Sequence, residues 1–184
     1  MSRSPLIVPT KVAAAPYMTL TNWNAHVGGN ANAFIYPPSA SVKMATPQGI
    51  PTDSWTSVTW QTQLWDTDDL WSATQPESLT IQTPGQYLVS AQISFSATTP
   101  GYSRIVGVRV NGEMQVAQYL RNLGVTFFGV LQTSGLITCQ RGDVITIDVF
   151  HDSGEQIWVK EDGSEWPNRF TLCWCGRNEA VFTY

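Results

Sequence analysis

A regular alternation of apolar and polar residues over Gln86–Ala97 limits the fold of this chain more than any other feature. Successive side chains of a β-strand point to opposite faces, so a period of two predicts a strand with one buried face. A tight turn is expected just before it, because in Thr83-Pro84-Gly85-Gln86 the proline presets one turn dihedral and the glycine accepts a positive φ. The apolar members of the strand are Tyr87, Val89, Ala91, Ile93 and Phe95.

The same pattern returns along the chain and predicts further strands. Val106, Val108 and Val110 alternate up to Asn111-Gly112, a strong signal for a type I′ hairpin turn. Turns separate the predicted strands, and no helical pattern extends over ten residues, so we predict an all-β fold, an antiparallel jelly-roll sandwich. The other expected strands cover residues 114–119, 125–130, 135–139, 145–150, 157–160 and 170–175.

The first fifty or so residues lack this alternation. Seven prolines and Gly28-Gly29 interrupt them, and their apolar residues are too many for a solvated linker. We expect an extended arm for attachment and assembly over 1–51, a jelly-roll domain over 52–176 and a short tail over 177–184. The alternative is that the arm contributes a few strands to the same domain. The arm residues expected to contact a partner are Trp23, Phe34, Ile35 and Tyr36.

Charge and cysteine content exclude several classes of protein. Ten Lys and Arg against 14 Asp and Glu give a net charge of −4, and no basic cluster could neutralise a row of phosphates, so a nucleic-acid partner is not expected. Three cysteines cannot form a complete disulfide framework, which favours a reducing compartment. No apolar run has the length of a signal peptide or a membrane span, so we expect no membrane insertion.

Several segments resemble the globular heads of the complement and tumour-necrosis-factor superfamily. The resemblance is closer to the version found in minor tail proteins and fibres of tailed phages, particularly phages of actinobacteria. There too an opening strand, here Ser54–Val58, precedes an acidic loop, here Asp66–Asp69. The segments that resemble the family cover Leu79–Tyr87, Val108–Gly112, Gly142–Ile147 and Phe170–Trp174.

This resemblance implies a ten-strand jelly roll that trimerises around a three-fold axis. It implies a non-enzymatic virion structural protein of the minor tail, tail-tip or fibre type, made in the host cytoplasm and carried in the virion. Its arm would bind other virion proteins. Two alternatives remain open, a capsid decoration or head-fibre protein and a module that binds a glycan receptor on the host surface.

No catalytic residues are expected. His151-Asp152-Ser153-Gly154 contains the residue types of a catalytic triad, but we predict a turn here, since neighbours on one turn are expected to point apart. His26 lies in the arm. We therefore predict no enzyme activity and no cofactor.

The acidic loop supplies the candidate metal ligands Asp66, Asp68 and Asp69. An EF-hand register from Asp66 requires Gly at its sixth position and meets Trp71 instead. A different calcium site remains an alternative, because complement-type heads hold a metal near the apex, and the plainer interpretation is a solvated acidic loop. Its further ligands would be Glu77, or Glu161 with Asp162.

Outward apolar residues and thiols predict an oligomer interface. Cys173-x-Cys175 lacks the further ligands that zinc requires, so we expect the thiols to pack as small hydrophobes between subunits. Trp65 and Trp71 are the candidate ligand surface, since stacked aromatics bind sugar faces, although packing in the core or at an oligomer interface is the stronger explanation for most tryptophans of a sandwich. The expected interface residues are Leu88, Ile105, Phe150, Cys173 and Cys175.

Overall fold

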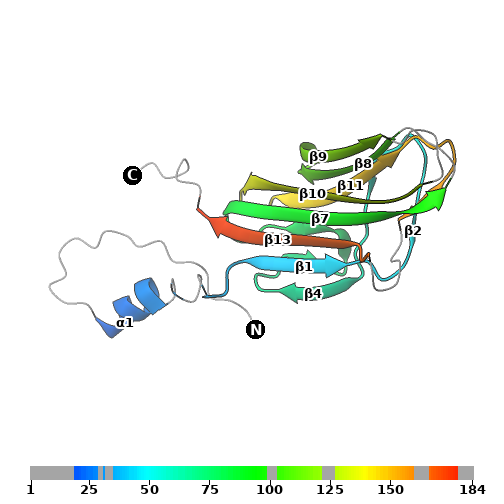
Figure 1. The fold of residues 1–184 in the computed structure, drawn as a ribbon. Helices are drawn as coiled ribbons and strands as arrows, with labels where there is room; N and C mark the ends of the chain where they lie inside the picture. Colours follow the sequence, from blue (N-terminus) through cyan, green and yellow to red (C-terminus); the bar gives the residue numbers. More distant parts are fainter. Residues whose placement is uncertain are drawn as a thin grey trace.

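The computed structural model is a two-layer antiparallel β-sandwich, as the sequence predicts. It describes residues 19–28, 31, 35–98, 103–121, 127–159 and 166–177. Figure 1 shows β8, β9 and β11 together in one layer, stacked on the layer that contains β1, β4, β7, β10 and β13.

Among the described residues, seven strands form the larger sheet, which we call sheet A. Its central strand is β7, the segment with the strongest alternation, and β10 pairs along it from Phe127 to Cys139. The strands, in sheet order, are β2 (Gln48–Ile50), β12 (Ile157–Val159), β7 (Gly85–Thr98), β13 (Arg169–Gly176), β1 (Ser39–Lys43) and β4 (Thr62–Asp66), with β10 (Phe127–Cys139) paired to β7.

Six further strands form sheet B in the described part of the chain. The central β11 pairs with β8 on one side and with β6 and β3 on the other. The strands, in sheet order, are β5 (Trp71–Ser72), β6 (Gln75–Thr80), β11 (Val144–His151), β8 (Ser103–Val110) and β9 (Glu113–Arg121), with β3 (Thr56–Ser57) paired to β11.

The core lies between the sheets and consists of the residues that the alternation assigns to the inner faces. Trp60 fills its centre with its ring centroid 5.8 Å from that of Phe170. Burying side chains of this size removes much apolar surface from water, which stabilises the sandwich. The inner residues predicted from the sequence and found buried are Tyr87, Val89, Ala91, Ile93, Phe95, Val106, Val108, Ile145, Ile147, Val149, Phe170 and Leu172.

The hairpin at Asn111-Gly112 has the predicted conformation. The φ angles of 51° and 84° at the two residues are the positive values that a type I′ turn requires. Val110 lies opposite Glu113 across the turn, which connects β8 to β9.

The boundary expected at residue 52 is wrong for the segment 39–51. Strand β1 lies between β13 and β4, and β2 pairs with β12, so the alternative of extra strands holds for this part. Residues 39–43 were missed because their inner face has only Ala40 and Val42, too short an alternation to recognise. We therefore restrict the term "arm" to residues 1–38.

The arm contains a short helical segment, which differs from the extended chain that we expected. It comprises α1 (Leu20–Trp23) and a following π-helical turn, η1 (Asn24–Gly28). Leu20, Trp23 and Val27 have the three- and four-residue spacing of one helix face. Figure 1 shows α1 apart from the sandwich, beyond the end where β1 begins and β13 finishes.

Two strands expected over 125–130 and 135–139 are one strand, β10, because Thr133 faces the core between them and keeps the alternation continuous. Within the described residues, no helix is long and apolar enough to cross a membrane.

Candidate interaction surface

The outer face of sheet A carries two exposed leucines side by side. Leu136 of β10 lies directly opposite Leu88 of β7, and their side chains are 57% and 47% exposed. Cys173 of β13 follows on the other side of Leu88, and Ser39 of β1 lies beyond it. We call Leu136, Leu88 and Cys173 the apolar row. It contains no charged side chain, and its position is set by strand register rather than by a flexible loop.

The neighbouring positions on this face are small and polar. Ser134, Ser90 and Thr171 form the next row across β10, β7 and β13. The Thr171 hydroxyl lies 2.9 Å from the hydroxyl of Ser41, within hydrogen-bond distance. Because these side chains are shorter than leucine, Leu88 and Leu136 project beyond the row beside them.

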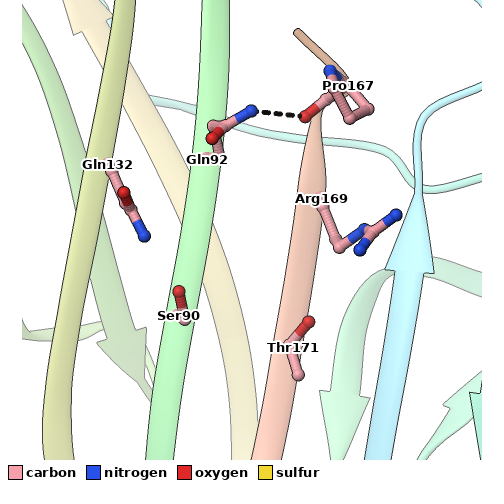
Figure 2. Close-up of a pocket in the computed structure, with 6 residues that line it drawn as sticks. All are labelled: Ser90, Gln92, Gln132, Pro167, Arg169 and Thr171. Carbon is pink, nitrogen blue, oxygen red and sulfur yellow. Dashed lines mark hydrogen bonds between the residues drawn. The ribbon is translucent and has the colours of Figure 1, made fainter. Parts of the chain in front are cut away.

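A shallow polar pocket lies further along the same face. Figure 2 shows Gln92 Nε2 donating a hydrogen bond of 3.0 Å to the Pro167 carbonyl, with Gln132 and Arg169 nearby. Arg169 is exposed, and Lys43 lies opposite it in the β1–β13 pair. This end of the face is therefore polar and basic, whereas the end at the apolar row is uncharged.

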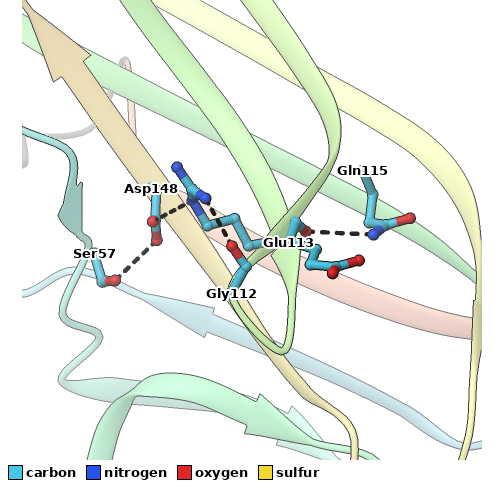
Figure 3. A network of polar contacts seen from close by, with 6 residues as sticks. Ser57, Gly112, Glu113, Gln115 and Asp148 are labelled. Atoms are coloured by element: carbon cyan, nitrogen blue, oxygen red, sulfur yellow. Dashed lines mark hydrogen bonds and ion pairs between the residues drawn. The ribbon is translucent and has the colours of Figure 1, made fainter.

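Part of the outer face of sheet B, around β3, is covered by its own side chains. Trp55 packs on Phe150 with ring centroids 5.5 Å apart, and the Arg109 guanidinium lies 5.0 Å from the Trp55 ring centroid. Arg109 Nε pairs with Asp148 at 2.8 Å, and the Ser57 hydroxyl donates to the same carboxylate (Figure 3). These contacts fix β3 on β11 and leave Phe150 half-buried.

The predicted interface residues therefore lie on opposite faces of the sandwich. Leu88, Cys173 and the exposed Cys175 belong to sheet A, whereas Ile105 and Phe150 belong to sheet B. The structure does not bring the two groups together. Leu136 was missed because Leu136 and Ile137 are adjacent apolar residues, and the alternation alone does not show which one is buried.

The tryptophans separate into buried and exposed members. Trp60 is fully buried, while Trp55 is 39% exposed, so only one of the two belongs to the core. Trp65 on β4 is 44% exposed and lies opposite Ser41 on the sheet A side. Trp71 is half-buried and packs against the core. The two candidate ligand-surface tryptophans do not form an exposed pair.

Asp66 orders the acidic loop by accepting hydrogen bonds from backbone N–H groups within it. One of its carboxylate oxygens accepts a 3.1 Å hydrogen bond from the backbone N–H of Asp68, and the other accepts one of 2.8 Å from that of Trp71. Asp69 adopts a positive φ of 54°, a turn conformation that aspartate tolerates. Among the described residues, no group of three or more His, Cys, Asp or Glu could hold a metal ion. Glu161 and Asp162 lie outside the described residues.

His151 and Ser153 are in contact, contrary to the expectation that they point apart. The Ser153 hydroxyl lies 2.9 Å from His151 Nδ1, and the other ring nitrogen lies 2.9 Å from the Ile50 carbonyl. Asp152 accepts hydrogen bonds from Ser103. In a catalytic triad the carboxylate binds the second ring nitrogen, which here faces a backbone carbonyl. This is a buried structural corner, with no triad geometry.

The three cysteines carry free thiols. Burial, with a smaller contribution from Asp143, raises the pKa of Cys139 to about 12, so its thiol is protonated at neutral pH. Burial and then the neighbouring Cys175 also raise the pKa of Cys173. Protonated thiols act as small apolar side chains, as expected for Cys173 in the apolar row.

Comparisons with known proteins agree with the fold. No family model matches the sequence, and no curated protein matches it. Two similar solved structures are the globular domain of zebrafish complement 1qA and murine APRIL. The first has a TM-score of 0.53 at 16% identity, covering 77% of this chain and 99% of that chain. The second has a TM-score of 0.55 at 16% identity, covering 75% and 98%.

The fold is a complement- and tumour-necrosis-factor-like jelly roll. At this level of identity the similarity establishes the architecture alone. Three of the four predicted contact residues of the arm, Trp23, Ile35 and Tyr36, lie within the described part, and all three are exposed. Phe34 lies outside the described residues, as do residues 178–184 of the predicted tail.

Proposed function

We propose that this chain forms the trimeric head of a phage particle, as a non-enzymatic structural protein of the minor tail, tail-tip or fibre type. The observation that carries the proposal is the uncharged apolar row on the outer face of a jelly-roll sheet. Exposed neighbouring leucines on a rigid sheet are typical of a surface that another subunit covers. A closed cyclic oligomer buries such a patch in every copy.

The virion assignment rests on the sequence resemblance to phage tail and fibre heads. The residues on which this resemblance rests are the opening segment Ser54–Val58 and the acidic loop Asp66–Asp69, and each has a role in the fold. The opening segment supplies β3 on sheet B, and Asp66 orders the loop that leads to β5. On this proposal the protein is made in the host cytoplasm and resides in the virion, where the arm binds other virion proteins.

Light scattering of the full chain tests the oligomer. We expect the mass of three chains at micromolar concentration. A charge in the apolar row, Leu136→Asp, should shift the population towards monomer, because an unpaired carboxylate is costly to bury. The matched control is Tyr119→Asp, which places the same charge at a side chain that is 51% exposed on β9 of the other sheet. A stable wild-type monomer would contradict the trimer.

A second candidate function is recognition of a host-surface glycan, which the exposed Trp65 favours. Aromatic rings stack on sugar faces, and Trp65 is reachable at the edge strand β4. The test compares particle yield with adsorption to cells for Trp65→Ala alone and together with Trp71→Ala. Intact particles that no longer adsorb would favour recognition, whereas lost particles would favour the structural role. Labelling of particles with an antibody, viewed by electron microscopy, separates a tail position from capsid decoration.

A further inference from the structure

We propose that a pocket beside β5 and β6, on the outer face of sheet B, binds a single neutral sugar ring. The pocket has a volume of about 240 Å³. The inference goes beyond the proposed structural role, and it gives the second candidate function, glycan recognition, a site that does not include Trp65. It does not depend on the trimer, because the pocket and the apolar row belong to different sheets.

Strand β6 and the residues after it form one side of the pocket. Leu79 and Ile81 are fully buried in the core. The residues that alternate with them, Ser78, Thr80 and Gln82, therefore face outward, and all three line the pocket. Pairing of β6 with both β5 and β11 fixes their positions. This side of the pocket is consequently set by strand register.

Asp69 and Trp71 supply the other side of the pocket. The Trp71 ring is half-buried and packs against the core, which holds it in place. Its backbone N–H donates a 2.8 Å hydrogen bond to the Asp66 carboxylate, and the Leu70 carbonyl accepts one of 2.7 Å from the Thr80 N–H. These two bonds tie the loop before β5 to β6, so both sides of the pocket are ordered before a ligand arrives.

Several polar groups of the pocket residues lack a hydrogen-bond partner among the described residues. The indole N–H of Trp71 is buried and has no acceptor. The side chains of Gln75, Thr80 and Gln82 also make no hydrogen bond within this part of the chain. Because a buried donor without an acceptor is costly, an oxygen atom that accepts from this indole would be favoured.

The residue types of the lining match the groups of a neutral sugar. An aromatic ring can stack on the face of a sugar, and hydroxyl and amide groups both donate to and accept from its hydroxyls. Asp69 is the one charged residue among those that line the pocket, and its carboxylate accepts from hydroxyls and repels anions. The uncharged hydrogen-bonding residues are Ser72, Gln75, Ser78, Thr80 and Gln82.

The volume limits the ligand to one ring. A water molecule occupies about 30 Å³ of the liquid, so the 240 Å³ of the pocket correspond to about eight water molecules. This is room for one sugar ring and too little to enclose two. The remaining sugars of a glycan would extend into solvent, so we identify the ligand as the terminal sugar of a chain.

The polar pocket on sheet A is a weaker candidate for the same ligand. Its volume is similar, about 190 Å³, but none of the residues that line it is aromatic, and Arg169 brings a positive charge. It also lies on the same face as the apolar row. This pocket therefore serves as the control in the experiment below.

NMR titration of the full chain tests the site. The probes are the methyl glycosides of glucose, galactose, mannose and N-acetylglucosamine, added separately, and the Trp71 indole N–H signal is identified by its loss in Trp71→Phe. We expect at least one probe to shift this signal with a Kd of about 1–10 mM, since one small ring makes few contacts. No shift with any probe at roughly ten times that Kd overturns the inference. Light scattering reports separately on the trimer, so the two proposals fail independently.

Two substitutions locate the sugar within the pocket. Gln82→Ala and Thr80→Val each remove hydrogen-bonding groups from the β6 side and should weaken binding about two- to tenfold, the equivalent of one hydrogen bond. The matched control Gln132→Ala removes the same amide from the pocket on sheet A and should leave the Kd unchanged. Weaker binding in Gln132→Ala or Trp65→Ala, with no effect of Gln82→Ala, would place the sugar elsewhere and overturn this site.

The charge of the ligand separates the sugar from other classes. N-acetylneuraminate, a sugar with a carboxylate, should not bind because Asp69 repels it, and equal binding would contradict a neutral ligand. Asp69→Asn keeps the positive φ of 54°, which asparagine tolerates, and should weaken binding of the neutral sugar several-fold. Tetramethylammonium tests for a cation held by the ring and the carboxylate. If it alone shifts the Trp71 signal, the pocket binds cations and the sugar is excluded.

Discussion

Trp55 and Trp60 show how strongly position decides the role of one residue type. They lie five positions apart, and the structure places one on the outer face of sheet B and the other in the core. Trp60 contacts core side chains such as Phe170, whereas Trp55 contacts Phe150 and Arg109 on one side and water on the other.

The two tryptophans should therefore differ in their effect on stability. Trp60→Ala leaves a cavity in the core and should reduce the free energy of unfolding by about 3–5 kcal/mol. Trp55→Ala removes a ring contact and a cation–π contact at the surface and should cost about 1–2 kcal/mol. Urea unfolding of both variants measures the difference, and equal losses would contradict the assignment of Trp60 to the core.

His151 is a buried imidazole held in its neutral form. It lies opposite Arg104, which is 2% exposed, in the β8–β11 pair. Burial lowers the pKa of His151, with a smaller lowering by Arg104, and these outweigh the raising effects of the Ile50 hydrogen bond and of Asp152 and Asp53. Protonation would place a second positive charge beside Arg104.

Stability should consequently fall in mild acid. The folded-state pKa of His151 lies below the unfolded value of about 6.5, so the unfolded chain takes up the proton first. The contribution of His151 is present above about pH 6.5 and is lost as the pH falls through the folded-state pKa. Unfolding free energies at pH 7.5 and 5.5 should differ more in the wild type than in His151→Gln, and an equal difference would contradict the buried neutral imidazole.

At the level of strands, alternation predicts the strands that have a long buried face and misses strands that are short or have no buried face. β7, β8, β11 and β13 were predicted because one face of each lies in the core. β4 could not be, since all five of its residues are exposed or half-buried and leave no apolar period to recognise. Its place depends on pairing with β1, about twenty residues away in sequence, and such a partner is not encoded locally.

The candidate surface could be predicted from the sequence only in part. Leu88 and Cys173 were expected to point outward from the parity of their strands, and they do. Their alignment with Leu136 in one row could not be predicted, because it depends on the register between β7, β10 and β13. Strand register is set by the packing of whole faces, so it becomes visible only in the structure.

Asn111 joins two elements, the β8–β9 hairpin and the turn before β11. Its side-chain amide donates to Asp143 Oδ1 and accepts from the Val144 N–H, both at 2.9 Å. Asn111→Gly keeps the turn and removes these bonds, which should cost about 1–2 kcal/mol of unfolding free energy.

A second substitution separates the turn conformation from the hydrogen bonds. Asn111→Ala should cost about 1 kcal/mol more than Asn111→Gly, because alanine tolerates the φ of 51° poorly. Gln115→Ala, an exposed position on β9, is the matched control and should stay within about 0.5 kcal/mol of the wild type. Thermal and urea unfolding measure all three, and an Asn111→Gly variant as stable as the control would show that the side chain does not join the elements.

For the whole molecule, the point at which the head begins decides which truncations fold. The head needs β1 between β13 and β4, and it needs β2 on β12, although both strands lie within the first fifty residues. Met44 and Ile50, which flank the turn between them, are fully buried. Removing β1 and β2 would leave β13 and β12 without these pairing partners and would take these two buried side chains out of the core.

Two deletions test this boundary. Deletion of residues 1–36 leaves β1, β2 and the core intact, so the head should unfold within a few degrees of the full chain. Deletion of residues 1–51 removes four fully buried apolar side chains, Ala40, Val42, Met44 and Ile50, together with two strands. At about 2–5 kcal/mol for each large side chain, the loss approaches the whole stability of an ordinary domain, and we expect this fragment not to fold. Circular dichroism during heating measures the unfolding of both deletion variants. Cooperative unfolding of the fragment that begins at residue 52 would mean that the head folds without β1 and β2.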